Sequence, residues 1–284
     1  MRINTNVNSL NARESSYAVN KNLTSSLEKL SSGLRINKAS DDASGLAIAD
    51  KLRTQASSIK QSIANANSAT SLIQIADKAM AEQSNILDIV KTKLIQAKTA
   101  TTSDDGRAAI LSDVQKLLTQ LDAIAQQTNY NGVNLLQSGT GAADTAGAGP
   151  LTFQVGELTG NTIVASTAHA NTAKLALSTL KGAAWGGASF ATNSGTLMGT
   201  VDTALTTLNT QRGDFGSVQN QLESATRNMM TTHTNIKAAE SVIRDVDYAT
   251  ESANFNKQNI IAQAGTYAMS QANSIQQNVL RLLQ

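Results

Sequence analysis

The sequence predicts a mainly α-helical protein, in which long coiled-coil helices form an elongated helical bundle with a small central β-hairpin region. Aromatic residues make up only 3% of the 284 residues and proline occurs once, which favours long thin helices over a thick core. Apolar residues recur at alternating spacings of three and four along both ends of the chain, the repeat of a coiled coil or helical bundle. The middle is instead rich in Gly, Ala and Thr, and it holds Pro150 and Trp185.

The longest apolar stripe falls within residues 44–100. As one helix, at 1.5 Å per residue, this segment would be a rod of roughly 85 Å, too long for a compact domain. After a turn at residues 103–106, a second stripe predicts a helix that folds back along the first. The Asn131-Gly132 pair is a strong turn signal that ends this helical half. The first stripe consists of Ala49, Leu52, Ala56, Ile59, Ile63, Ala66, Ile73, Met80, Leu87 and Leu94, and the second of Leu111, Val114, Leu118, Leu121 and Ile124.

Short strands are predicted in the middle of the chain. Residues 151–155 and 162–165 alternate or cluster apolar residues as strands do, and glycines lie between them, so we expect a small hairpin. The stretches 138–149 and 182–195 are rich in Gly, Ala, Thr and Ser, and we expect them to form exposed loops.

Both ends of the chain are predicted to be amphipathic helices without a full core of their own. An isolated helix is marginal in water and needs a partner for its apolar face, so we expect the ends to order only on assembly. The apolar stripe of the C-terminal half begins at Val201 and runs to Val246. The stripes of the two ends contain Val7, Leu10, Leu23, Leu27, Leu30 and Leu34, and Ile261, Ala264, Ala268, Ala272, Ile275, Val279 and Leu282.

Several classes of function find no support in the composition. A net charge of +2 without a basic block does not suit nucleic-acid binding, and no apolar run is long enough to span a membrane. Cysteine is absent and His169 and His233 lie far apart, so we predict neither a disulfide nor a metal site nor a cofactor. Asp41 and Asp42 are expected to cap the helix that follows them rather than to act as an acid–base pair. The sequence has no phosphate-binding loop and no Gly-x-Ser-x-Gly elbow, so we do not expect an enzyme.

Motifs at both ends of the chain carry a family resemblance. Residues 30–37 read Leu-Ser-Ser-Gly-Leu-Arg-Ile-Asn, and residues 39–49 read Ala-Ser-Asp-Asp-Ala-Ser-Gly-Leu-Ala-Ile-Ala. Near the other end, Arg-Asp-Val-Asp-Tyr at 244–248 is followed by Glu-Ser-Ala-Asn-Phe at 251–255. Together with Ile-Asn-Thr-Asn at 3–6, these stretches resemble the signature of the bacterial flagellins, in the right order along the chain.

The resemblance implies an inner core and a surrounding tube. Residues 1–43 would be the N-terminal part of the inner-core coiled coil and its connecting spoke, and residues 44–137 the long N-terminal helices of the tube. Residues 138–195 would form an outward-facing hairpin and loop region, 196–243 the C-terminal tube helix, and 244–284 the C-terminal connector and inner-core helix. The middle is too short for the larger outer domains of many flagellins. We therefore expect a short, core-and-tube flagellin, resembling those of the Campylobacter and Helicobacter group.

The function implied by the resemblance is assembly of the extracellular flagellar filament that drives motility. The subunit would leave the cell unfolded through the type III export route and add to the filament beneath a cap protein. Its partners would be other copies of itself, the cap and hook-junction proteins, and a flagellin chaperone that holds the C-terminal helix. Residues expected to pack in the filament core are Leu23, Leu27, Leu30, Leu34, Ile261, Ala268, Ala272, Ile275, Val279 and Leu282.

A finer expectation concerns the innate-immune receptor called Toll-like receptor 5. In flagellins that activate it, the long helix carries an arginine-rich patch, which aligns with Asp88, Ile89, Val90, Lys91, Thr92 and Lys93. Here Ile89 and Lys91 replace the arginines and Thr92 replaces the acidic residue. Because a bidentate donor and a carboxylate are missing, we expect weak activation. Alternatively, this face only packs on a neighbouring subunit.

Modification of the central region is a second finer expectation. Exposed hydroxyls at Thr140, Thr145, Ser189 and Ser194 are candidate O-glycosylation sites, and a plain solvated loop is the alternative. Two other classes of protein compete with the flagellin interpretation. One is a hook–filament junction protein with a similar Leu-Ser-Ser-Gly signature, and the other is a secreted amphipathic-helix protein that acts on membranes.

Overall fold

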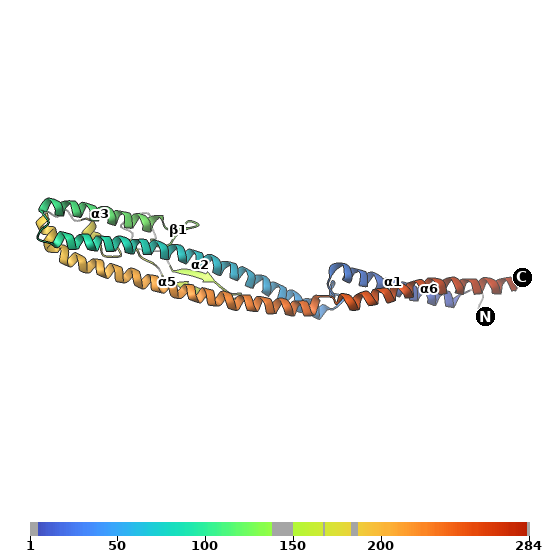
Figure 1. Cartoon of the computed structure of the whole chain (residues 1–284). Coiled ribbons are helices and arrows are strands. Elements are labelled where there is room, and N and C mark those ends of the chain that lie inside the picture. Colours follow the sequence, from blue (N-terminus) through green and yellow to red (C-terminus); the bar gives the residue numbers. More distant parts are fainter. Residues whose placement is uncertain (1–4, 138–149, 167, 183–186, 283–284) are drawn as a thin grey trace. The chain divides into compact units, whose positions relative to one another are not determined.

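A computed structural model describes residues 5–137, 150–166, 168–182 and 187–282 (Figure 1). The prediction of a mainly α-helical chain with long helices and a small central hairpin is confirmed. In chain order the elements are α1 (Val7–Ser32), α2 (Ala43–Lys98), α3 (Asp104–Gln127), β1 (Asn129–Tyr130), β2 (Val133–Asn134), β3 (Leu151–Gln154), β4 (Thr162–Ala165), α4 (Ser178–Lys181), α5 (Gly187–Arg244) and α6 (Tyr248–Leu282).

The chain folds as two compact units. Unit 1 comprises residues 1–57 and 233–284, and unit 2 comprises residues 58–232. The long helices α2 and α5 each contribute to both units. The domain boundaries expected from the sequence, after residues 43 and 243, stay a prediction.

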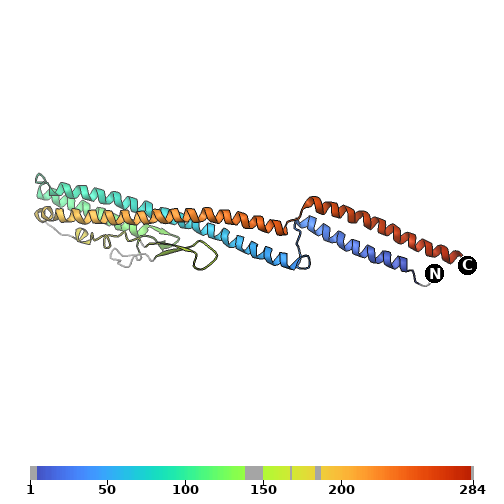
Figure 2. The same ribbon diagram turned by 90° about the horizontal axis from the view of Figure 1, so that it is seen from below.

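The stripe predicted along α2 forms the core of unit 2. Its members from Ile59 to Leu94 are buried, except Ile63, which is half-buried. The helices α3 and α5 run along α2 in both views (Figures 1 and 2). Ion pairs fix the alignment of α2 with α5: Lys91 bonds Asp202 at 2.5 Å and Arg212 bonds Asp77 at 2.8 Å.

The second predicted helix, α3, folds back along α2 as expected. Ser103 caps it by accepting a hydrogen bond from the N–H of Gly106 at 3.2 Å. The first helical turn carries Asp104 and Asp105, whose charges complement the positive end of the helix dipole. The predicted turn at 103–106 is therefore the cap and first turn of the helix.

Both hairpins follow from local sequence. Asn131 and Gly132 have φ values of 50° and 80°, as the tight turn between β1 and β2 requires. The predicted central hairpin is confirmed, with β3 pairing antiparallel to β4 from Leu151 opposite Ala165 to Gln154 opposite Thr162.

The prediction of a loop at 182–195 is wrong for the second half of this range, because α5 already begins at Gly187. Phe190, Ser194 and Leu197 are buried on one face of this first part of α5. Their spacing continues the stripe that begins at Val201. Packing of that face outweighs the weak helix propensity of the Gly, Ser and Thr residues around it.

A strap of residues 168–172 crosses the three long helices of unit 2 and is held by one side chain from each. Gln83 of α2 donates to the carbonyl oxygen of Ala170 at 2.8 Å. Asp122 of α3 accepts hydrogen bonds from the N–H and the hydroxyl of Thr172, both at 2.8 Å. Gln211 of α5 donates to a further strap carbonyl at 3.4 Å. The sequence analysis did not find this strap.

Candidate assembly surface

The helices α1 and α6 lie side by side, although they come from opposite ends of the chain (Figures 1 and 2). At one end of the pair, the side-chain amide of Asn6 donates to the carbonyl oxygen of Ala272 at 3.2 Å. Asn6 also caps α1 by accepting a hydrogen bond from the N–H of Ser9 at 3.1 Å.

This pair of helices buries little of its own apolar surface. Among the described residues, Ser26 is the one buried side chain of α1, and α6 has none. Leu27 is 56% exposed and Ile275 is 55% exposed. Of the residues predicted to pack in a filament core, Leu23, Leu30, Leu34 and Ala272 are half-buried, Ala268 and Ile261 are exposed, and the side chains of Val279 and Leu282 lie outside the described set.

The sequence analysis missed part of the exposed apolar surface, namely Tyr17 on α1 and Ile260 and Tyr267 on α6, although it included Leu10. Tyr17 and Tyr267 are each 75% exposed, and an exposed Leu10 and Ile260 lie seven residues before them. Seven residues make two helical turns, so each pair shares one face of its helix. The heptad spacing of these aromatic and aliphatic residues was the available signal.

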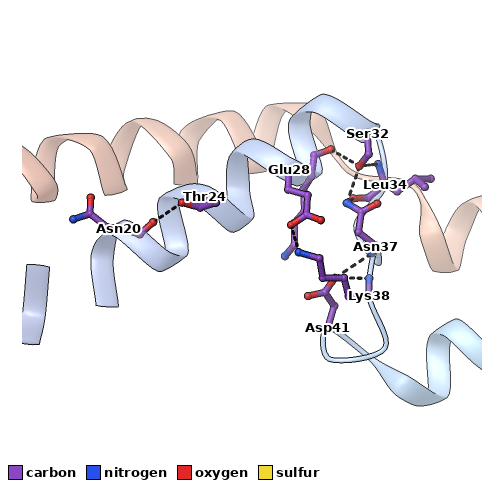
Figure 3. Close-up of polar contacts among 9 residues, drawn as sticks. Asn20, Thr24, Glu28, Ser32, Leu34, Asn37, Lys38 and Asp41 are labelled. Carbon is purple, nitrogen blue, oxygen red and sulfur yellow. Dashed lines mark hydrogen bonds and ion pairs between the residues drawn. The ribbon is translucent and has the colours of Figure 1, made fainter. Parts of the chain in front are cut away.

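The loop that follows α1 is ordered by polar side chains (Figure 3). Asp41 accepts hydrogen bonds from the N–H groups of Asn37 and Lys38, each at 3.0 Å. These N–H groups hold the pKa of Asp41 below its usual value. Lys38 bonds Glu28 at 2.6 Å, which raises the pKa of the lysine. The side chain of Asn37 donates to Ser32 at 2.7 Å, so the loop is folded back on the end of α1.

One of the two caps predicted after this loop is confirmed, and the end of α1 is set by a glycine. α1 ends at Ser32, and Gly33 follows in the left-handed conformation with a φ of 73°. Asp42 accepts a hydrogen bond from the N–H of Gly45 at 2.9 Å and so caps α2. Asp41 instead accepts hydrogen bonds from N–H groups within the loop, so the prediction that it caps the helix was wrong.

The two connectors between the terminal and long helices are paired with each other. The N–H of Arg35 donates to the carbonyl oxygen of Arg244 at 2.6 Å, and the N–H of Val246 donates to that of Gly33 at 3.0 Å. These bonds flank an antiparallel bridge between Leu34 and Asp245. We call residues 33–35 and 244–246 the connector clasp.

The segment that aligns with the receptor patch is only partly available on the surface. Val90 is fully buried, and Lys91 and Lys93 are engaged by Asp202 and Asp113 in ion pairs of 2.5 and 3.1 Å. The predicted patch is therefore reduced on the surface to the exposed Asp88, Ile89 and Thr92 and the two paired lysines.

Of the candidate glycosylation sites, Ser189 is exposed on α5. Ser194 is fully buried, because it lies on the core-facing side of α5, and its selection as an exposed acceptor was wrong. Thr140 and Thr145 lie outside the described residues.

Neither a metal site nor a membrane-spanning helix occurs in the described part of the chain. There, no cluster of three or more His, Asp or Glu side chains could hold a metal ion. Among the helices of these residues, none combines the length and apolar character that crossing a bilayer requires. The feature that stands out is a pair of terminal helices with largely exposed apolar faces, which is typical of helical proteins that associate with other chains.

Comparison with known proteins identifies the family. Residues 3–140 match the family described as bacterial flagellin N-terminal helical region, and residues 198–283 match the bacterial flagellin C-terminal helical region. The chain therefore belongs to the bacterial flagellins, and it is a structural subunit of the flagellar filament.

Individual relatives agree. The chain is 36% identical to the flagellin of Bacillus subtilis, with 100% of both chains covered. It is 27% identical to flagellin B of Helicobacter pylori over an alignment of 511 positions that covers 100% of this chain and 99% of the relative. Since this chain has 284 residues, the alignment needs long gaps, as expected for a short flagellin.

A solved structure assigned as a flagellar hook-associated protein from Vibrio parahaemolyticus has a similar fold. The TM-score is 0.60 at 12% identity, covering 72% of this chain and 99% of that one. This likeness concerns the fold alone.

Proposed function

We propose that the subunit joins the filament by burying the exposed apolar faces of α1 and α6 against the same helices of neighbouring copies. The observation that carries this is the incomplete burial within the pair. Leu27 and Ile275 are more than half exposed although α1 and α6 contact each other. An apolar surface of this kind on both ends of the chain needs further copies to cover it.

Covering these apolar faces would supply the driving force for assembly. Burying apolar surface yields about 25 cal/mol per Å², so covering the exposed half of a Leu or Ile stabilises by roughly 1 kcal/mol. Several such residues on each helix together give a useful driving force. A contact in which different faces of two copies meet produces a helical filament when the rotation between copies does not close into a ring.

The proposed path to the filament involves the same helices. We propose that the chain is exported unfolded by the type III route and added beneath the cap at the extracellular tip. A flagellin chaperone would cover the apolar face of α6 before export, and hook-junction proteins would contact the base of the filament. The many exposed apolar residues of α6, among them Ile260 and Tyr267, support the need for such a cover.

The role is structural and not catalytic. The chain lacks cysteine nucleophiles, and the motifs of common hydrolases and nucleotide-binding enzymes do not occur in its sequence. Neither nucleic acid nor membrane is proposed as a partner. The membrane-active alternative is disfavoured by the low charge of the chain, because interfacial helices of that kind are rich in basic residues.

The test compares matched aspartate variants. Leu27→Asp and Ile275→Asp place a charge on the terminal faces, and we expect each to reduce filament formation at least tenfold. Val164→Asp is the control, because Val164 of β4 is 51% exposed but lies outside the terminal helices. Filament formation is measured by sedimentation and electron microscopy. The stability of unit 2 is measured by thermal melting. Normal assembly of both terminal variants would contradict the proposal.

The location of this chain in the flagellum distinguishes a filament subunit from a hook–filament junction protein. Electron cryomicroscopy of purified surface filaments, with the subunit identified by mass spectrometry, should find this chain along the whole filament. Finding it only beside the hook would favour the junction protein.

A further inference from the structure

The connector clasp is held by a small number of polar contacts and by the packing of Tyr248 on Gly33. Besides its two backbone hydrogen bonds, the guanidinium of Arg35 donates to the carbonyl oxygen of Ile243 at 2.6 Å. Arg244 lies 3.8 Å from a carboxylate oxygen of Asp50, a pair whose carboxylate is about half exposed. Exposed hydrogen bonds and surface ion pairs are individually weak, so these contacts alone do not hold the clasp firmly closed.

The helices on one side of the clasp add little to its stability. Within the described residues, α1 and α6 together bury one side chain, Ser26, whereas α2 buries a continuous stripe. Regions with few buried apolar contacts open at a lower free energy than the core of the same protein. Opening of the clasp with α1 and α6 is therefore easier than unfolding of unit 2.

Closing the clasp determines how the two terminal helices meet. Gly33 directly follows the end of α1, and Val246 lies two residues before Tyr248, where α6 begins. Pairing these residues places the end of α1 against the start of α6. The side-by-side alignment of their apolar faces follows from this fixed point and from the Asn6 bond at the other end.

We propose that closure of the connector clasp makes a free subunit competent to join the filament. The free subunit exchanges between an open and a closed clasp, and only the closed form presents both terminal faces together. This inference rests on the filament function proposed above. When a protein binds through a fractionally populated form, its apparent affinity falls by that fraction, and locking the form removes the loss.

The geometry of the clasp offers a way to lock it. Its hydrogen bonds join Arg35 to Arg244 and Val246 to Gly33, so Leu34 and Asp245 form a non-hydrogen-bonded pair. In such pairs the Cα atoms are about 4.5 Å apart, within the range of a disulfide. The chain contains no cysteine, so a Leu34→Cys/Asp245→Cys variant forms no competing disulfide.

The experiment compares the oxidised and reduced forms of this double variant. Monomers of each extend short fragments of wild-type filament, and the lowest concentration that supports growth is measured by light scattering and electron microscopy. For a clasp closed in about a tenth of free subunits, the oxidised form should grow at a concentration about tenfold lower. Equal concentrations for both forms would overturn the proposal. The two single cysteine variants, blocked by alkylation, control for loss of the native side chains.

Hydrogen exchange gives a second, independent readout on the wild-type chain. The amides of Arg35 and Val246 are the donors of the clasp. We expect them to exchange at least tenfold faster than the core amides of unit 2 in the monomer, and to become protected in the filament. Protection in the monomer equal to that of the unit 2 core would contradict an open form.

The two proposals fail in different ways. If wild-type monomers do not extend wild-type fragments at all, the proposed joining through the terminal faces is overturned and the clasp proposal with it. If wild-type monomers extend them and the oxidised variant shows no gain, only the clasp proposal is overturned.

Discussion

The hydroxyl oxygen of Tyr248 lies 3.1 Å from the point that a Cβ atom would occupy on Gly33. This tyrosine, in the first turn of α6, therefore packs closely on the glycine that ends α1. Gly33 also has a φ of 73°, a conformation that residues with a side chain rarely adopt. The position thus disfavours other residues for two separate reasons, one conformational and one steric.

Replacing this glycine should weaken the junction of the terminal helices. For Gly33→Ala we expect about 1–2 kcal/mol of destabilisation, from the left-handed backbone and the displaced tyrosine ring. Circular dichroism at increasing temperature, with growth of wild-type filament fragments, measures the effect. Gly216→Ala is the control, because Gly216 lies within α5 with nothing within 4 Å of an added Cβ. This control should be neutral or stabilising by up to about 1 kcal/mol.

The buried carboxylate of Asp122 should be among the most sensitive positions in unit 2. It accepts hydrogen bonds from Thr172 and bonds Lys181 at 2.5 Å, with its side chain 4% exposed. Asp122→Ala leaves a buried N–H and an ammonium group without their partner, so we expect a loss of roughly 3 kcal/mol in unfolding free energy. Denaturant unfolding measures it.

An exposed ion pair between two helices of unit 2 supplies the comparison. Asp113, half-exposed, bonds Lys93 at 3.1 Å. Asp113→Ala should cost less than about 1 kcal/mol. Equal losses for the two variants would show that the strap contributes nothing beyond an ordinary surface contact.

The stability of the first turn of α6 should depend on pH. Asp247 accepts hydrogen bonds from the hydroxyl and N–H of Thr250 and from the N–H of Ala249, which lower its pKa below the usual 3.8. Because the folded pKa is depressed, this stabilisation is complete above about pH 3.8 and is lost as the pH falls through the lower folded value. Carboxyl chemical shifts in nuclear magnetic resonance measure the midpoint.

The hydroxyl of Thr250 is the largest cause of that shift. Thr250→Val should therefore move the titration midpoint of Asp247 upward, toward 3.8. Thr266→Val is the control, because the Thr266 hydroxyl bonds a backbone carbonyl and not a carboxylate. An unchanged midpoint in Thr250→Val would assign the shift to the backbone instead.

Activation of Toll-like receptor 5 by the native chain should be weak. It should increase when the residues of the aligned patch are substituted. Ile89 and Thr92 are exposed, and the Lys91 ammonium is bonded by Asp202. We expect Ile89→Arg/Lys91→Arg/Thr92→Glu to raise the response of a receptor reporter cell line at least tenfold. Ile75→Arg, an exposed position elsewhere on α2, is the control. Strong stimulation by the unmodified monomer would contradict the expectation.

Glycosylation can be tested by intact mass. Ser189 is exposed and remains a candidate acceptor, whereas Ser194 is enclosed in the core. If the region is modified, filaments from the native source should exceed the mass of the bare sequence, and Ser189→Ala should remove part of the excess. A native mass equal to the sequence mass would leave the solvated-surface alternative.

The sequence was most informative where structure depends on local periodicity. The stripe through Ile73, Met80 and Leu87 shows the register of α2, because residues seven apart share one helix face. Asn131-Gly132 identified its turn, since both residues tolerate a positive φ.

Long-range contacts explain what the sequence analysis missed. The connector clasp is built from backbone hydrogen bonds, which any residue but proline can donate, so no side-chain pattern marks it. Gln83 reads as an ordinary polar helix residue, and its burial becomes apparent only when the strap lies across it. The start of α5 was misplaced because tertiary packing of Phe190 overrides local propensity.

The alignment of α2 with α5 also has a consequence for the speed of folding. The Arg212–Asp77 pair joins residues 135 positions apart in the chain, and Lys91–Asp202 joins residues 111 apart. Contacts between such distant residues raise the contact order, and high contact order slows folding. Individual helices of this chain can form early. Unit 2 cannot reach its final packing until most of the chain is available to fold, because its contacts join residues far apart in the sequence. A polypeptide that folds late stays unfolded for longer, as the export in an unfolded form that we propose requires.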